Sequence, residues 1–244
     1  MSSEMWLAGV DGCRSGWVAA FWRPADDEIA VRVVPRFADV VGAPERPVIV
    51  TVDMPTGLPE RIGPAGRGPE AAVRPLLGAR QSSVFSVPSR AAIYAEDFGE
   101  ACRIAAATSD PPRKVSKQLF MIAPKIREVD AALRADAAAA ARVFEVHPEV
   151  AFWRLNGERA LDQPKKVKSR PYEPGLALRR GLLISAGIPE AIACASPPAG
   201  AAADDLIDAL ACAVIARRIH VGRAQPFPPH VGRDAFGLPI AIWA

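Results

Sequence analysis

The chain has 244 residues, 50% of them apolar and 23% charged, and a formal net charge of +3. This composition can fill a folded core, and the charge is too small for a polycation, so we expect any nucleic-acid contact at a local patch. The cysteines form no CxxC pair and no apolar run reaches the ~18 residues of a membrane span, which excludes cysteine-based zinc sites and integral membrane proteins. Residues 1–6 lack the basic start of a signal peptide, and we expect a reduced, cytoplasmic protein.

The first part of the chain predicts strands joined by short turns, which is typical of an antiparallel meander. These strands are expected at residues 6–10, 17–22 and 29–34. A short helix at 37–42 follows, and then an all-apolar strand at 48–52, which predicts a buried central position in a sheet.

The rest of the chain alternates helices with one further strand. Residues 54–70 are rich in glycine and proline and predict a loop. Helices are expected at 89–107, 116–141, 148–155, 175–186 and 202–221, a strand at 142–146 and a polar loop at 158–174. We therefore predict an α/β fold: a mixed sheet flanked by helices, forming a single domain over residues 1–225 with a mostly helical insertion at about 54–141. Residues 226–244 show no clear pattern and are expected to be a C-terminal tail.

Asp208 stands in a stretch, 206–216, that is otherwise apolar. A helix that is apolar all round is buried, and a buried carboxylate without a partner is costly, so we expect Asp208 to have a function. Asp204 and Asp205 precede it on the same helical face. These two acids have another explanation, because the first turn of a helix favours acidic residues.

Other acidic residues lie at or near the ends of predicted strands. Asp11 and Asp53 each follow an apolar strand, where an Asx turn is the alternative interpretation, and Glu145 lies within a strand between apolar neighbours. Carboxylates gathered from distant segments suit Mg²⁺ or Mn²⁺, and two such ions held ~3.5–4 Å apart promote phosphodiester hydrolysis. The sequence therefore predicts an acidic metal site.

Several motifs resemble one family of uncharacterised proteins, described as predicted nucleases with a ribonuclease H-like fold, over residues 7–221; the acidic helix is more distantly similar to that of Holliday-junction resolvases. The motifs are Gly9-Val10-Asp11-Gly12-Cys13-Arg14, Ser82-Ser83-Val84-Phe85 with Pro88 and Arg90, Pro124-Lys125-Ile126 with Glu128 and Asp130, Glu145-Val146-His147-Pro148-Glu149, and Asp205-Leu206-Ile207-Asp208-Ala209-Leu210-Ala211. The motifs at 82–90 and 124–130 have no counterpart in the well-studied resolvases.

This resemblance implies a two-metal nuclease on a ribonuclease H-like sheet. It implies Asp11, Asp53, Asp205 and Asp208 as metal ligands, with Glu145 as an added ligand or base. The predicted catalytic residues are then Asp11, Asp53, Glu145 and Asp208.

The basic residues that we expect to bind substrate phosphates are Arg14, Lys125 and Lys166. All six lysines lie between 114 and 168, while every other basic residue except histidine is arginine. This bias indicates that these positions require an ammonium group, for example to contact phosphate. A solvated surface is an equal alternative, with Arg14 building a turn and Lys125 pairing with Glu128.

The leading function is a metal-dependent nuclease acting on DNA or RNA, with the nucleic-acid type left open. One alternative is an actin-like phosphotransferase or ATPase, although such proteins carry two similar halves, which this chain lacks. Another alternative is a non-catalytic binding protein that keeps an acidic pocket. The sequence also leaves a homodimer open.

Overall fold

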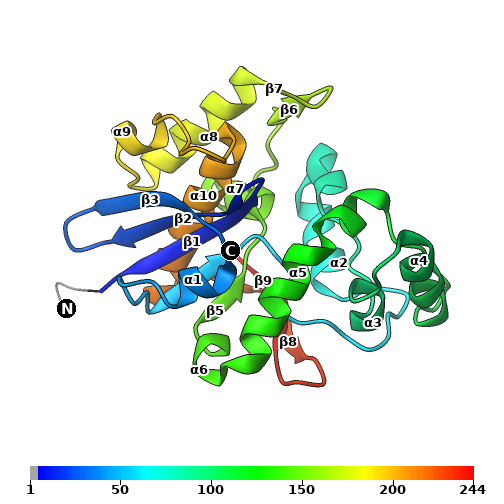
Figure 1. The fold of residues 1–244 in the computed structure, drawn as a ribbon. Coiled ribbons are helices and arrows are strands. Elements are labelled where there is room, and N and C mark those ends of the chain that lie inside the picture. The colour runs from blue at the N-terminus through cyan, green and yellow to red at the C-terminus, as the bar shows by residue number, and fades with distance from the viewer. Residues whose placement is uncertain (1–4) are drawn as a thin grey trace.

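The computed structural model describes residues 5–244 as a mixed seven-stranded sheet with helices on both faces (Figure 1). Strands β1 (Leu7–Cys13), β2 (Gly16–Arg23) and β3 (Glu28–Val34) form the expected antiparallel meander. Strand β4 (Ile49–Val52) pairs in parallel with β1, and β5 (Val143–Glu145) pairs in parallel with β4. The strand order β3-β2-β1-β4-β5-β9-β8 begins with the arrangement expected of a ribonuclease H-like fold, and the architecture is consistent with that fold.

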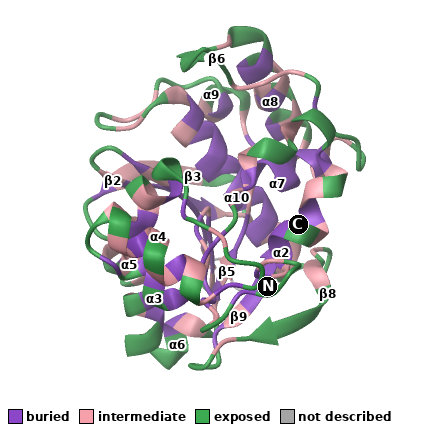
Figure 2. Cartoon of the chain, turned by 90° about the vertical axis from the view of Figure 1, so that its right-hand side faces the viewer, coloured by how far each residue is buried: buried purple, intermediate pink, exposed green. Residues whose placement is uncertain are grey.

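Helix α10 (Ala203–His220) packs across one face of the sheet with α7 (Pro148–Leu155), α8 (Glu173–Ser185) and α9 (Glu190–Ala193). The sequence predicts its burial correctly, because every residue from Leu206 to Ala216 is buried. Figure 2 shows this helix as part of the buried interior of the molecule, whereas the edge strand β8 (Pro226–Arg233) is largely exposed. The helix approaches β1 very closely at Gly9, where a Cβ atom would lie 2.0 Å from the Ala213 nitrogen.

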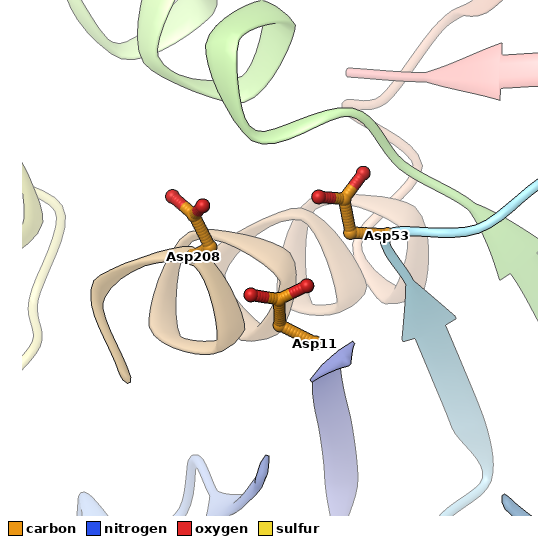
Figure 3. A group of neighbouring side chains, drawn as sticks. All are labelled: Asp11, Asp53 and Asp208. Atoms are coloured by element: carbon orange, nitrogen blue, oxygen red, sulfur yellow. The ribbon is translucent and has the colours of Figure 1, made fainter. Parts of the chain in front are cut away.

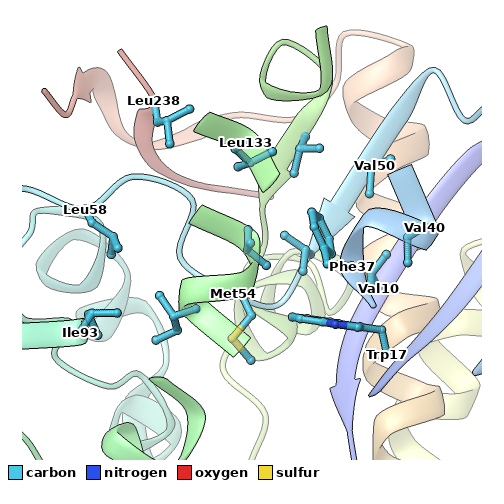
Figure 4. Close-up of a cluster of buried hydrophobic side chains, with 14 of the residues drawn as sticks. Val10, Trp17, Phe37, Val40, Val50, Met54, Leu58, Ile93, Leu133 and Leu238 are labelled. Carbon is cyan, nitrogen blue, oxygen red and sulfur yellow. The ribbon is translucent and has the colours of Figure 1, made fainter. Parts of the chain in front are cut away.

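The opposite face is covered by α1 (Phe37–Val41) and α5 (Lys117–Ala135). Their apolar side chains pack with alternate side chains of β1, β2 and β4, as Figure 4 shows for Val10, Trp17 and Phe37. The rings of Trp17 and Phe37 lie 5.3 Å apart between centroids. The sheet is therefore buried on both faces.

The segment between β4 and β5 is mostly helical, as expected. It contains α2 (Pro69–Val73), 3-10 turns at Arg74–Leu76 and Gly78–Ser83, α3 (Arg90–Ile93), α4 (Phe98–Ala107), α5 and α6 (Ala137–Ala140). Both long predicted helices are interrupted. Asp97 starts α4 and Asp136 starts α6 by accepting hydrogen bonds from backbone N–H groups, which ends the preceding helical segment.

The C-terminal residues differ from the predicted tail. Strands β8 (Pro226–Arg233) and β9 (Pro239–Trp243) form a hairpin, and β9 pairs in parallel with β5 at the edge of the main sheet. The prolines of β8 conceal this strand in the sequence, because proline is tolerated only on an edge strand or at a bulge. A second small hairpin, β6 (Lys166–Val167) and β7 (Arg170–Pro171), lies within the predicted polar loop.

Residues 1–4, part of the segment where no signal peptide is predicted, lie outside the described residues. Across residues 5–244, no helix has both the length and the apolar character needed to cross a membrane.

Candidate metal centre

Three aspartates from distant parts of the chain meet at one edge of the sheet. Asp11 lies in β1, Asp53 directly follows β4, and Asp208 lies on α10 (Figure 3). One carboxylate oxygen of each lies within 4.8 Å of those of the others. Of the four aspartates expected as metal ligands, the structure brings these three together.

The fold itself creates this meeting point. Strands β1 and β4 run in parallel and end at the same edge, where the Asp53 N–H donates to the Val10 carbonyl at 3.0 Å. The Gly12 N–H donates to Asp11 Oδ1 at 2.7 Å, which orients that carboxylate. The close packing of α10 on Gly9 then brings Asp208 to the same edge.

Burial and neighbouring carboxylates destabilise the charged forms of these three aspartates. Burial, followed by the charges of Asp53 and Asp208, raises the pKa of Asp11 well above its ordinary value. Burial raises the pKa of Asp53 to about 7 and that of Asp208 to about 7. The Oδ1 atom of Asp208 is buried without a hydrogen-bond partner among the described residues. A buried acceptor in such a group calls for a cation.

Lys165 supplies one cation to this group. Its Nζ forms an ion pair with Asp208 Oδ2 from the base of the β6–β7 hairpin. Burial alone would lower the pKa of Lys165, but the carboxylates around it, chiefly Asp208, raise it above the ordinary value, so Lys165 stays charged. Lys165 is not among the residues predicted to bind metal or substrate; the signal that could have found it is the clustering of all six lysines between 114 and 168 in an otherwise arginine-based chain.

Asp205 and Lys166 lie beside the group rather than in it. Asp205 Oδ2 accepts a hydrogen bond from the Ala202 N–H at 2.8 Å, which caps α10, and Lys166 pairs with Asp204 at 2.6 Å. Asp205 does not belong to the three-carboxylate group found among residues 5–244. Its role as a metal ligand therefore stays a prediction.

Glu145 is bound by a buried arginine. Arg67 donates to both Glu145 oxygens and to Glu70 Oε1, and the Thr56 N–H also donates to Glu145 Oε2 at 3.1 Å. The Arg67 side chain is fully buried. Burial raises the pKa of Glu145, and Arg67 opposes that shift. Sequence reasoning missed Arg67 because nothing in its loop marks it as the partner of a strand residue.

The other predicted substrate contacts lie on the meander side. Arg14 is exposed at the β1–β2 turn. Lys125 Nζ lies 4.5 Å from the centroid of the Trp17 ring and donates to the Gly16 carbonyl. Glu128, the partner considered for Lys125, accepts instead from Trp17 Nε1 at 3.1 Å and from the Phe37 N–H.

A cavity of about 230 Å³ opens beside Asp11 and Asp53. It is lined by the motif residues Ser83, Val84 and Phe85, and by Glu145 and His147. Burial lowers the pKa of His147, whose Nδ1 accepts from the Glu149 N–H at 3.2 Å and so caps α7. The 82–90 and 145–149 motifs thus form the walls of the space next to the aspartates.

Some motif residues have structural partners away from the aspartates. Arg90 pairs with Asp130 and with Asp234, each at 2.7 Å, and Arg179 donates to both oxygens of Glu149, at 2.7 and 2.8 Å. Arg90 therefore joins the helical insertion to the C-terminal hairpin, and Arg179 neutralises Glu149.

The fold and this site define an α/β protein with a mixed sheet and a buried group of carboxylates at its edge. The chain belongs to a family described as protein of unknown function (DUF429), whose model matches residues 9–233. No curated protein and no solved structure matches the chain.

Proposed function

We propose that this protein is a divalent-metal-dependent nuclease that hydrolyses phosphodiester bonds. The observation that carries the proposal is the buried group of Asp11, Asp53 and Asp208, with its unpartnered Asp208 oxygen. Oxygen ligands of this kind suit hard cations, and we propose Mg²⁺ or Mn²⁺. The arrangement of acids on β1, after β4 and on the last long helix supports the resemblance to ribonuclease H-like nucleases.

The residues present fit such an ion. One carboxylate oxygen of each aspartate lies within 4.8 Å of those of the others, and a positive charge there would offset the cost of burying the three carboxylates, which raises their pKa values. A bound divalent ion would activate water and stabilise charge on the leaving oxygen. Asp11 is held by the Gly12 N–H and keeps its orientation without an ion.

The surrounding residues can contribute to binding of a nucleic acid. Arg14 is exposed beyond the same end of β1, and Lys166 lies at the rim of the site, half exposed beside Asp204. Both suit contacts to phosphate oxygens. Lys125 reaches the same turn through the Gly16 carbonyl. We assign these residues to substrate binding and leave the type of nucleic acid to experiment.

The test compares the wild-type protein with Asp208→Asn and with the control Asp162→Asn, which changes an exposed acid. Mg²⁺ and Mn²⁺ binding is measured by calorimetry, and cleavage is measured on labelled single-stranded, duplex, hybrid and branched substrates. We expect saturable binding and metal-dependent cleavage in the wild type and the control, and loss of both in Asp208→Asn.

Two results would contradict the proposal. Metal binding without cleavage of any substrate would support a metal site but contradict nuclease activity. Absence of binding, with and without nucleic acid, would favour a binding protein that only retains acidic residues.

A further inference from the structure

The β6–β7 hairpin delivers a lysine to the group of aspartates. Lys165 directly precedes β6, and its ammonium pairs with Asp208 Oδ2, the oxygen opposite the unpartnered Oδ1. The Lys165 side chain is 21% exposed and that of Asp208 is 6% exposed, so water screens this pair only in part. The ammonium therefore lies at the boundary between the carboxylates and solvent.

The charges at the site can be counted from its contacts. Asp11, Asp53 and Asp208 bring three negative charges when ionised, and Lys165 brings one positive charge. Glu149 adds a fourth negative charge near Asp53 and Asp208, and Arg179, which donates to both Glu149 oxygens, adds a positive charge, so this pair leaves the balance unchanged. The remaining two negative charges match one divalent cation, whereas two divalent cations beside the Lys165 ammonium would leave two positive charges in excess, against one without Lys165.

We propose that Lys165 takes the place of a second divalent ion, so that the site binds one Mg²⁺ or Mn²⁺ per chain. This inference rests on the metal site of the proposed function and departs from the two-metal arrangement implied by the family resemblance. In a one-ion site, the Lys165 ammonium supplies beside Asp208 the positive charge that a second ion would otherwise supply.

The identity of the side chain supports this assignment. Lysine is a compact point charge on a flexible stem, whereas arginine is a planar fork that prefers paired contacts. Elsewhere the chain uses arginine for its buried pairs with carboxylates, at Arg67, Arg90 and Arg179. Among these buried pairs in residues 5–244, the Lys165–Asp208 pair is the one whose cation is an ammonium group.

The test is a titration of the purified protein with Mg²⁺ at pH 8.5, followed by calorimetry. It compares the wild type with Lys165→Met, with the charge-conserving Lys165→Arg, and with Lys168→Met, which removes an exposed lysine from the same hairpin. We expect one ion per chain in the wild type and in Lys168→Met.

Lys165→Met should bind a second ion and hold the first at least about tenfold more tightly, because a positive charge beside the site has been removed. Lys165→Arg should keep one ion. A lysine that only stabilises the fold would lower the melting temperature in Lys165→Met without changing the number of ions bound.

Two ions per wild-type chain would overturn the inference, as would one ion per chain with unchanged affinity in Lys165→Met. If Lys165→Met fails to fold, as judged by circular dichroism, the wild-type ion count decides alone. The titration contains no nucleic acid, so its result is independent of the cleavage assay. Cleavage by a protein that binds two ions would refute only this inference. A protein that binds one ion and cleaves nothing would refute only the proposed function.

Discussion

Asp53 lies in the group of aspartates with no hydrogen bond to its side chain among those found in residues 5–244, so its charge has less compensation than those of Asp11 and Asp208. Its pKa rises from the ordinary 3.8 to about 7 on burial. The folded state therefore keeps a proton on this carboxyl between about pH 4 and pH 7, where the unfolded chain has lost it. The stability that this proton provides is complete below about pH 4, is lost progressively between about pH 4 and pH 7, and is absent above pH 7.

Asp53→Asn should remove this pH dependence. In metal-free protein containing a chelator, we expect the variant and the wild type to have similar unfolding free energies at pH 4. At pH 8 the variant should be more stable by about 1 kcal/mol, a value reduced for the partial exposure of Asp53. Urea denaturation at both pH values measures the difference, and a variant less stable than the wild type at pH 8 would contradict a cost of burying the charged Asp53 carboxylate.

For Glu145, the sequence predicts that the residue is buried but not which residue it pairs with. Asp11, Asp53 and Asp208 were identifiable because each carboxylate breaks or ends an apolar run that must be buried. Glu145 gave the same signal, yet its nearest charged partner is Arg67, 78 residues earlier in the chain. A pattern within one segment reveals that an acid is buried, but it does not reveal which distant side chain neutralises it.

Glu145→Gln should therefore affect stability more than metal binding. The change leaves the fully buried Arg67 with one carboxylate partner, Glu70, and we expect a loss of about 3 kcal/mol. Mg²⁺ affinity should stay at the wild-type value, with Glu60→Gln, an exposed acid, as the control. A large loss of Mg²⁺ affinity in a folded Glu145→Gln protein would instead identify Glu145 as a ligand.

At the scale of elements, the site depends on how closely α10 lies against β1. The contact is backbone to backbone, because Gly9 has no side chain and a Cβ there would lie 2.0 Å from Ala213 N and 2.3 Å from Ala209 O. Thr51 strengthens the same packing by donating its hydroxyl to the Cys212 carbonyl at 2.7 Å. The distance between Asp11 and Asp208 is thus fixed by glycine, alanine and one threonine.

Gly9→Ala should separate these elements. We expect a loss of about 3 kcal/mol from overpacking, together with weaker Mg²⁺ binding, because Asp208 moves with the helix. The control is Gly181→Ala on α8, where an added Cβ meets nothing within 4 Å. That substitution should stabilise the protein by about 0.5–1 kcal/mol. Thermal unfolding and Mg²⁺ titration of both variants check the expectation; unchanged values in Gly9→Ala would contradict it.

Helices and strands were predicted correctly where the pattern within the segment determines its structure. They were missed where pairing with a distant segment determines it. The positions of β1 to β5, α7, α8 and α10 follow from apolar periodicity and from proline and glycine at helix ends. The hairpin of β8 and β9 exists because β5 offers an edge for pairing, which residues 226–244 do not disclose. The breaks before α4 and α6 depend on single capping aspartates in otherwise helical sequence.

At the scale of the whole molecule, the C-terminal hairpin holds the sheet and the helical insertion together. Ile240, Ala241 and Ile242 are buried in β9, and Asp234 accepts hydrogen bonds from Arg90 and from the Leu58 N–H. These contacts join the last residues of the chain to segments that lie between β4 and β5. The matched family model, which extends to residue 233, includes β8 and ends before β9.

Deletion of residues 226–244 should therefore destabilise more than the hairpin itself. It exposes the edge of β5 and leaves the buried Arg90–Asp130 pair without Asp234. We expect loss of a single cooperative transition in thermal unfolding followed by circular dichroism. A truncated chain that melts at the wild-type temperature in one transition would show that the hairpin is an independent appendage.

The spread of the aspartates along the chain, from position 11 to position 208, also has a consequence for biosynthesis. A chain still being made on the ribosome has Asp11 and Asp53 long before α10 has been translated, and domains fold only once their segments are available. Until then two carboxylates exist without the third and without Lys165. The group of three aspartates can therefore assemble only after α10 has been translated, and amino-terminal fragments that end before α10 cannot form it.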